Sequence, residues 1–189
     1  PIPTVKFTKT NACEGNDVVF TNLTTPSSGV NSSWNFGNGV TKNDNAVTVK
    51  YKYPVAGAYN VTLTANLNGC AATNTQRVYQ FPKPKASYTK VSGSCDNDEF
   101  SFNNTSTIAS GTIGSNWDFN DGNYSTEEDP SHTFSSSGAK DVKLVVTSVF
   151  GCKDSVTKPI NVLESPKVAF VNTAACSRTA TEFTNTTPV

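Results

Sequence analysis

Apolar and polar residues alternate along many short stretches of the chain. Tyr59, Val61, Leu63 and Ala65 alternate with asparagine and threonine. Residues two apart point to the same face of a β-strand, so this stretch predicts a strand with one buried and one wet face. The same period recurs, with apolar positions at Val18 and Phe20, at Trp34 and Phe36, at Val47, Val49, Tyr51 and Tyr53, and at Val142, Leu144 and Val146.

Turn signals separate these stretches. Asn38-Gly39 and Asp121-Gly122 are dipeptides typical of tight hairpins. Threonine, asparagine, serine and valine are abundant, and few stretches favour helix. Several short strands joined by polar turns predict an all-β chain built from antiparallel β-sandwiches.

The whole pattern repeats along the chain. Cys95 lies 82 residues after Cys13, and Cys176 lies 81 residues after Cys95; these three are called the opening cysteines. A repeat of this length predicts a tandem array and points to a structural or binding role more than to catalysis. The copies align through Pro3, Phe7, Phe20 and Asn22, through Pro84, Tyr88, Phe102 and Asn104, and through Pro166, Phe170, Phe183 and Asn185.

This alignment predicts two complete domains and the start of a third. The complete domains cover residues 1–80 and 81–164, and residues 165–189 hold the opening strands of a third copy. An isolated set of opening strands leaves an exposed sheet edge, so this segment is expected to be the least stable. Prolines in the joints, Phe81-Pro82-Lys83-Pro84 and Glu164-Ser165-Pro166-Lys167, predict semi-rigid spacers and a rod of sandwiches.

Each complete copy contains a second cysteine at a fixed distance. Cys70 follows Cys13 by 57 residues, and Cys152 follows Cys95 by 57. This equality predicts one disulfide per domain, Cys13–Cys70 and Cys95–Cys152, and leaves Cys176 without a partner in this chain. Free core cysteines or a metal site are the alternatives, although one histidine and no C-x-x-C pair disfavour zinc. Disulfides persist in oxidising compartments, so a location outside the cytosol is expected.

Net charge and hydropathy argue against nucleic acid and membranes as partners. The chain has 15 basic and 15 acidic residues, which disfavours nucleic acid and anionic membranes as electrostatic partners. No apolar run approaches the ~20 residues of a membrane span, so direct membrane insertion is not expected.

Two segments carry a family resemblance. Trp34-Asn-Phe-Gly-Asn-Gly39 and Trp117-Asp-Phe-Asn-Asp-Gly122 resemble the W-D-F-G-D-G signature of polycystic kidney disease (PKD) domains, which are immunoglobulin-like sandwiches. Pro130-Ser-His132-Thr-Phe134 and Gly57-Ala-Tyr59-Asn-Val61-Thr-Leu63 are similar to the motifs that follow it. The motif residues implied to be structural are Trp34, Phe36, Gly39, Tyr59, Trp117, Phe119, Gly122 and His132.

Some positions depart from the family pattern. Asn35 and Asn38 replace motif aspartates, and Asn120 replaces a glycine, but asparagine keeps the same turn chemistry. Lys140 stands where Tyr59 would be expected, which puts a tyrosine-corner hydrogen bond in doubt in the second domain.

The resemblance also implies a function. The cysteine pairs and the F-T-N-x-T segments look like PKD arrays of large surface proteins in Bacteroidetes-type bacteria, including gliding and attachment adhesins exported by the type IX route. The expectation is a non-catalytic, rod-like segment of a secreted or cell-surface adhesin. Its partners would be neighbouring repeats of the same chain and, in addition, surface glycans or other cell-surface proteins. The alternative is an ancillary spacer or substrate-engaging module of a secreted polysaccharide- or protein-degrading enzyme.

Few residues suggest chemistry of their own. Trp34 and Trp117 could stack on sugars, but a tryptophan on an inner strand of such a sandwich is more often part of the core. Outward aromatic residues are better candidates for contacts, with a ligand or with the neighbouring unit; they are Tyr51, Tyr79, Tyr124 and Phe150. His132 is the one histidine, and no nucleophile, metalloprotease or phosphate-loop motif accompanies it, so no catalytic residue is assigned.

Calcium is the one cofactor that the sequence keeps open, and only as a weak candidate. Carboxylates in turns offer the hard oxygen ligands that calcium prefers, although their spacing fits no EF-hand. Turn capping is the competing explanation for these residues. The acidic candidates are Asp96, Asp98, Glu99, Asp118 and Asp121.

Overall fold

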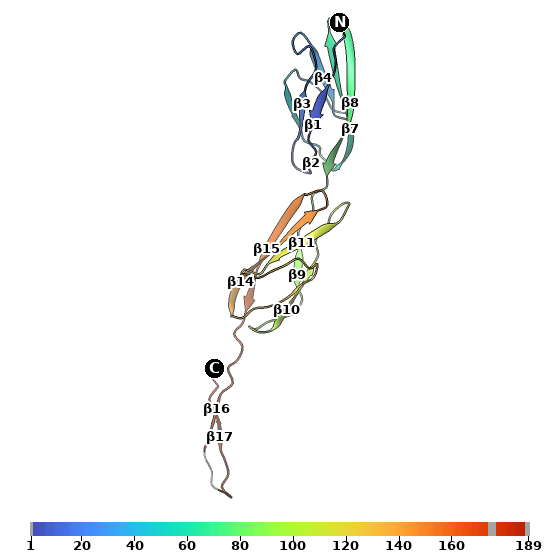
Figure 1. Ribbon diagram of the computed structural model, residues 1–189. Helices are drawn as coiled ribbons and strands as arrows, with labels where there is room; N and C mark the ends of the chain where they lie inside the picture. Colours follow the sequence, from blue (N-terminus) through green and yellow to red (C-terminus); the bar gives the residue numbers. More distant parts are fainter. Residues whose placement is uncertain (1, 174–176, 188–189) are drawn as a thin grey trace. The chain divides into compact units, whose positions relative to one another are not determined.

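The computed structural model describes residues 2–173 and 177–187, and every regular element within them is a β-strand (Figure 1). The predicted all-β fold is therefore confirmed. No helix in this part of the chain is long and apolar enough to cross a membrane.

Packing divides the chain into two compact units. Unit 1 consists of Pro1–Ala86, Ser106–Gly114 and Val146–Asp154, and unit 2 of Ser87–Thr105, Ser115–Val145 and Ser155–Val189. Unit 1 thus contains the whole first repeat together with two short segments from the sequence of the second.

The first repeat folds as two facing sheets of an immunoglobulin-like sandwich. One sheet has the strand order β1-β3-β6, and the other has the order β2-β8-β7-β4-β5. All pairings are antiparallel except that β2 runs parallel to β8. The strands are β1 (Phe7–Lys9), β2 (Ala12–Cys13), β3 (Val18–Asn22), β4 (Asn31–Asn35), β5 (Thr41–Asn43), β6 (Thr48–Tyr51), β7 (Gly57–Leu67) and β8 (Cys70–Phe81).

Aromatic rings fill the space between these sheets. The Trp34 ring is fully buried, with its centroid 5.2 Å from that of Phe7 and 5.4 Å from that of Phe20. Val61 and Leu63 of β7 are also fully buried, as the alternation predicts. The run from Val47 departs from its predicted pattern, because β6 begins at Thr48 and leaves the Val47 side chain 67% exposed.

The second repeat builds the same two sheets. Their orders are β13-β10-β9 and β12-β11-β14-β15. Trp117 is again buried, with its ring centroid 5.0 Å from Tyr88 and 5.7 Å from Phe102. The strands are β9 (Tyr88–Lys90), β10 (Glu99–Asn104), β11 (Ile113–Asp118), β12 (Tyr124–Ser125), β13 (Ser131–Thr133), β14 (Gly138–Ser148) and β15 (Lys153–Val162).

The last segment forms one two-stranded ribbon. β16 (Phe170–Asn172) pairs with β17 (Phe183–Asn185) in the register that joins β1 to β3. The side chains of Phe170 and Phe183 are 63% and 68% exposed, whereas their counterparts in the first repeat are buried. Among the described residues this ribbon pairs with no further strand, and an isolated two-stranded ribbon is marginally stable in water.

The structure corrects the predicted disulfides. Cys13 bonds to Cys152, with a Cα–Cα distance of 5.6 Å, while Cys70 and Cys95 are free thiols. Cys176, predicted to lack a partner, lies outside the described residues.

Strand register explains why the predicted bonds cannot form. Cys13 pairs with Phe81 at the end of β8, whereas Cys70 begins that strand. Eleven residues of strand separate those two places by about 36 Å, far beyond the ~4.4–6.8 Å between bonded Cα atoms. Cys95 likewise bridges to Leu163, after the end of β15, whereas Cys152 lies just before its start.

Candidate functional site

The glycine-rich turn after Trp34 is held closed by its own side chains. The Phe36 N–H donates to the Val40 carbonyl at 3.0 Å, and the Gly37 N–H donates to Asn35 Oδ1 at 2.9 Å. Asn38 reaches out of the turn, because its side-chain amide donates to the Tyr51 hydroxyl at 2.9 Å.

The equivalent turn of the second repeat is closed in the same way. The Phe119 N–H donates to the Asn123 carbonyl at 3.2 Å, and the Asn120 N–H donates to Asp118 Oδ1 at 2.9 Å. Asp121 Oδ2 lies 2.7 Å from His132 Nε2. Burial alone would raise the pKa of the Asp121 carboxyl, but the hydrogen bonds from His132 and Asn123 outweigh it and hold that pKa below its ordinary value.

His132 and Tyr51 therefore do the same work in their two repeats. The His132 ring stacks on Phe119 with centroids 4.1 Å apart, and the Tyr51 ring stacks on Phe36 at 3.9 Å. Each ring also holds the side chain of the turn, Asp121 in one repeat and Asn38 in the other. Because a tyrosine serves in the first repeat, these contacts give His132 a structural role in fastening the turn to the neighbouring strand.

The acidic residues considered for calcium are used by the backbone around them. Asp98 Oδ2 accepts the Cys95 N–H at 2.8 Å, and Asp96 Oδ1 accepts the Ser165 N–H at 2.6 Å. Hydrogen bonds from Ser165 also lower the pKa of the Asp96 carboxyl and outweigh the opposing effect of desolvation. Glu99 lies exposed on β10. Within the described ranges, no three acidic, histidine or cysteine side chains gather into a metal-binding group.

The tyrosine-corner position differs between the repeats. The Tyr59 hydroxyl donates to the Val55 carbonyl four residues earlier, at 2.7 Å. At the matching place Lys140 donates from Nζ to Ser136 Oγ, also four residues earlier, at 3.1 Å. The second repeat thus replaces the expected contact with another local hydrogen bond.

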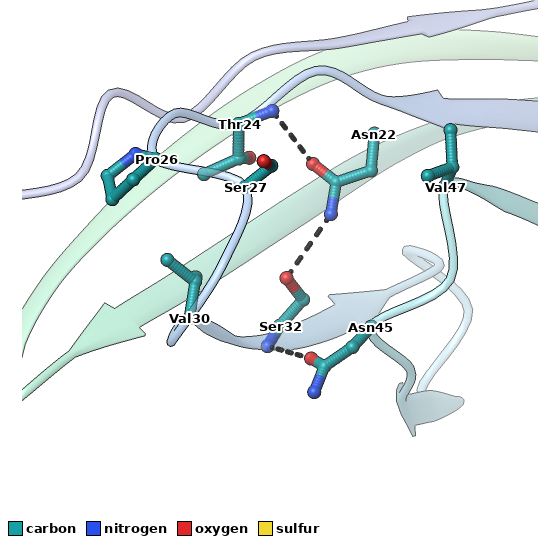
Figure 2. Close-up of a pocket in the computed structure, with 8 residues that line it drawn as sticks. All are labelled: Asn22, Thr24, Pro26, Ser27, Val30, Ser32, Asn45 and Val47. Atoms are coloured by element: carbon teal, nitrogen blue, oxygen red, sulfur yellow. Dashed lines mark hydrogen bonds between the residues drawn. The ribbon is translucent and has the colours of Figure 1, made fainter.

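A small cavity of about 50 Å³ lies beside the F-T-N-x-T segment of the first repeat (Figure 2). Asn22 organises it: Oδ1 accepts the Thr24 N–H at 3.0 Å and Nδ2 donates to Ser32 Oγ at 3.2 Å. The Ser32 N–H in turn donates to Asn45 Oδ1 at 2.7 Å. A cavity of this volume admits a water molecule or two, well short of the ~300 Å³ at which pockets for small ligands begin.

Each of the other copies repeats one of the two Asn22 side-chain hydrogen bonds, which together are called the asparagine clamp. Asn104 Nδ2 donates to Ser115 Oγ at 2.9 Å, and Asn185 Oδ1 accepts the Thr187 N–H at 2.9 Å. The repeated asparagine of this segment thus ties a strand end to its neighbourhood in all three copies. Its recurrence indicates a structural purpose.

The bonded cysteines of unit 1 lie beside exposed aromatic rings. The ring of Phe81 stacks on that of Phe150 with centroids 4.5 Å apart, and on Tyr79 at 5.9 Å. Tyr79 and Phe150 are 39% and 45% exposed. A hollow of about 620 Å³ within unit 1 is lined partly by these three rings.

Two family models of the PKD domain match the chain, one over residues 4–79 and the other over residues 82–163. The chain belongs to the PKD-domain family. Its two PKD domains stand in tandem, and together the matches span most of the sequence. PKD domains are typically non-catalytic, extracellular modules of adhesins and secreted enzymes, and a disulfide bond fits such an oxidising setting.

Several solved structures are similar to parts or most of the chain. The PKD1 domain of Vibrio anguillarum Epp is 26% identical over 44% of this chain and 96% of that one, with a TM-score of 0.41. The PKD1 domain from the Vibrio cholerae metalloprotease PrtV is 29% identical over 43% and 98%, with a TM-score of 0.40. An I-band fragment of titin is 12% identical over 98% and 76%, with a TM-score of 0.53, which shows an immunoglobulin-like fold. No curated protein sequence matches the chain.

Proposed function

We propose that this tandem of PKD domains is a non-catalytic, rod-like segment of a large bacterial surface adhesin. The observation that carries the proposal is the Cys13–Cys152 bond, because it ties the first PKD sequence to the second in one covalent structure. Such a tie suits a segment that must hold its form outside the cell, where disulfides persist.

The hydrogen bonds of the motif residues support the same role. The ring of His132 fastens a turn, and the acidic residues near it cap backbone N–H groups. The side chains of these motif residues therefore stabilise the fold. Exposed aromatic rings such as Tyr79 offer contacts for surface glycans or other cell-surface proteins, since aromatic faces bind sugars and proteins alike.

Scattering and attachment measurements together test the proposal. Small-angle X-ray scattering of the oxidised chain is expected to give the profile of a stiff rod. The immobilised chain is expected to retain polysaccharide-coated or cell-derived surfaces without degrading them, and Tyr79→Ala is expected to weaken retention more than Tyr124→Ala, an exposed aromatic control.

Two results would reject the proposal. A scattering profile of freely jointed domains would refute the rod-like form. Turnover of a polysaccharide or protein by the chain would refute the non-catalytic role. An adjoining hydrolase domain in the parent protein would favour the ancillary module of a secreted enzyme instead.

A further inference from the structure

The two described opening cysteines occupy the same backbone position in their repeats. Cys13 pairs in parallel with Phe81, and Cys95 makes a parallel bridge with Leu163. In each case the next residue donates its N–H to that same partner: Glu14 to Phe81 at 2.7 Å, and Asp96 to Leu163 at 2.8 Å. The opening position is therefore one structural site that occurs twice.

The other two cysteines also share a position. Cys70 and Cys152 each follow a turn glycine with a left-handed backbone, at φ values of 87° for Gly69 and 81° for Gly151. Each turn joins the two longest strands of its repeat, β7 to β8 and β14 to β15. We call Cys70 and Cys152 the hairpin cysteines.

The disulfide uses one cysteine of each kind. The opening cysteine of the first repeat bonds to the hairpin cysteine of the second. The two thiols of the described chain are the complementary pair, the hairpin cysteine Cys70, which is exposed, and the opening cysteine Cys95, which is partly exposed. Cys70 occupies the position that the bonded Cys152 has in the second repeat, and Cys95 occupies the position that the bonded Cys13 has in the first.

The apolar residue that pairs with the opening cysteine is covered in the bonded copy and exposed in the free one. Phe81, beside Cys13, is covered by the stacked ring of Phe150, which comes from the same hairpin as Cys152. Leu163, beside Cys95, is 52% exposed. The free position therefore presents both a thiol and an uncovered apolar side chain, the two features that the hairpin covers at the bonded position.

We propose that Cys95 and Cys70 are the two halves of a further head-to-tail disulfide of the Cys13–Cys152 type. The partner of each is another copy of this repeat: Cys95 takes the hairpin cysteine of a copy placed after it, and Cys70 takes the opening cysteine of a copy placed before it. For the chain by itself, a second molecule supplies both, so that Cys95 of one molecule bonds to Cys70 of the next.

The bond forms by thiol–disulfide exchange with a small-molecule disulfide such as oxidised glutathione. The Cys70 thiolate attacks one sulfur of that disulfide, forms a mixed disulfide and releases one small thiolate. The Cys95 thiolate then attacks the Cys70 sulfur, forms the protein bond and releases the second small thiolate. The two protein thiols lose two electrons and two protons, and the small disulfide gains them as two small thiols.

Cross-linking of the full chain tests the proposal. The chain carrying Cys176→Ser is held in a glutathione redox buffer, quenched, digested without reduction and analysed by mass spectrometry. Mixed Cys70–Cys95 links are expected to exceed the sum of Cys70–Cys70 and Cys95–Cys95 links about tenfold or more, because docking raises the effective concentration of the matching pair. Random thiol oxidation at similar reactivity yields about as many like links as mixed ones, and that ratio, or no link at all, would overturn the proposal.

A matched pair of variants separates docking from reactivity. Leu163→Asp is expected to reduce the excess of mixed links severalfold, because it places a charge where the hairpin packs. Val168→Asp, at a side chain that is 82% exposed, is expected to leave the excess unchanged. Equal effects of the two substitutions would count against a packed joint. The cross-linking result does not depend on adhesion to a surface, so a failed adhesion assay would not contradict the disulfide proposal.

Discussion

Gly37 is the position at which one added methyl group should do the most damage to the first PKD domain. Its φ is +79°, a left-handed conformation that side chains rarely adopt. A Cβ there would lie 2.6 Å from the Asn60 carbonyl oxygen and 2.9 Å from the Asn60 nitrogen. Asn60 belongs to β7, which is hydrogen-bonded to β4 on one side and to β8 on the other, so its backbone cannot easily move away.

Gly39 provides a matched control two residues later in the same turn. Its φ is +88°, and an added Cβ would meet nothing within 4 Å. Gly39→Ala therefore carries the backbone penalty alone, about 1–2 kcal/mol. Gly37→Ala adds overpacking against a fixed strand, a further ~1–3 kcal/mol. The smaller entropy of the unfolded chain favours both alanine variants equally and cancels in the comparison.

The fluorescence of Trp34 reports the unfolding of the first domain separately from that of the second. Both substitutions are made in a Trp117→Phe background, so that the fluorescence change on heating comes from Trp34. A difference of 1–3 kcal/mol corresponds to a melting temperature lower by about 4 °C or more for Gly37→Ala than for Gly39→Ala. Equal melting temperatures would refute the reasoning. Asn120 holds the equivalent place in the second domain at a φ of 59°, so the penalty belongs to the close approach to Asn60 and not to the motif as such.

Three further outcomes are expected. Digestion of the oxidised chain without reduction should yield a linked peptide pair containing Cys13 and Cys152, and a pair linking Cys13 to any other cysteine would contradict the structure. Tyr88→Phe should lower the free energy of unfolding by about 1–3 kcal/mol in chemical denaturation, because the buried Tyr88 hydroxyl donates to a main-chain carbonyl at 2.7 Å. Asp121→Asn should lower the free energy of unfolding of the second domain at pH values above the ordinary carboxyl pKa of 3.8. The difference from the wild type should shrink as the pH falls below 3.8, because the pKa of Asp121 is lowered in the folded state. Denaturation curves in which the difference grows towards acid pH would contradict this prediction.

Burial in the sandwich follows closely from local sequence. Period-two alternation placed Phe20, Trp34 and Leu63 on inner faces, and all three are fully buried. The pattern failed at Val47, where the chain has not yet entered β6, because alternation does not mark where pairing begins. Alternation does not predict the asparagine clamp at Asn22, although the recurrence of F-T-N-x-T in the sequence is a usable signal for it.

The cysteine pairing could not be read from spacing. In a tandem repeat, equal intervals are preserved whether each cysteine bonds within its own copy or with the next one. The deciding information is three-dimensional: Cys13 lies at the end of β8 where Phe81 is, and Cys70 lies at the other end. Only strand register separates those two possibilities, and register is not visible in a count of residues.

The Cys13–Cys152 bond also determines what happens when the chain is pulled. Tension applied to the two ends of the oxidised chain passes from Cys13 directly to Cys152, so the loop that spans their sequence separation of 139 residues stays slack. That loop holds back about 460 Å of contour length, at ~3.3 Å per residue, until the bond is reduced. The extensibility of this tandem is therefore set by the redox state of its surroundings more than by the stability of either sandwich.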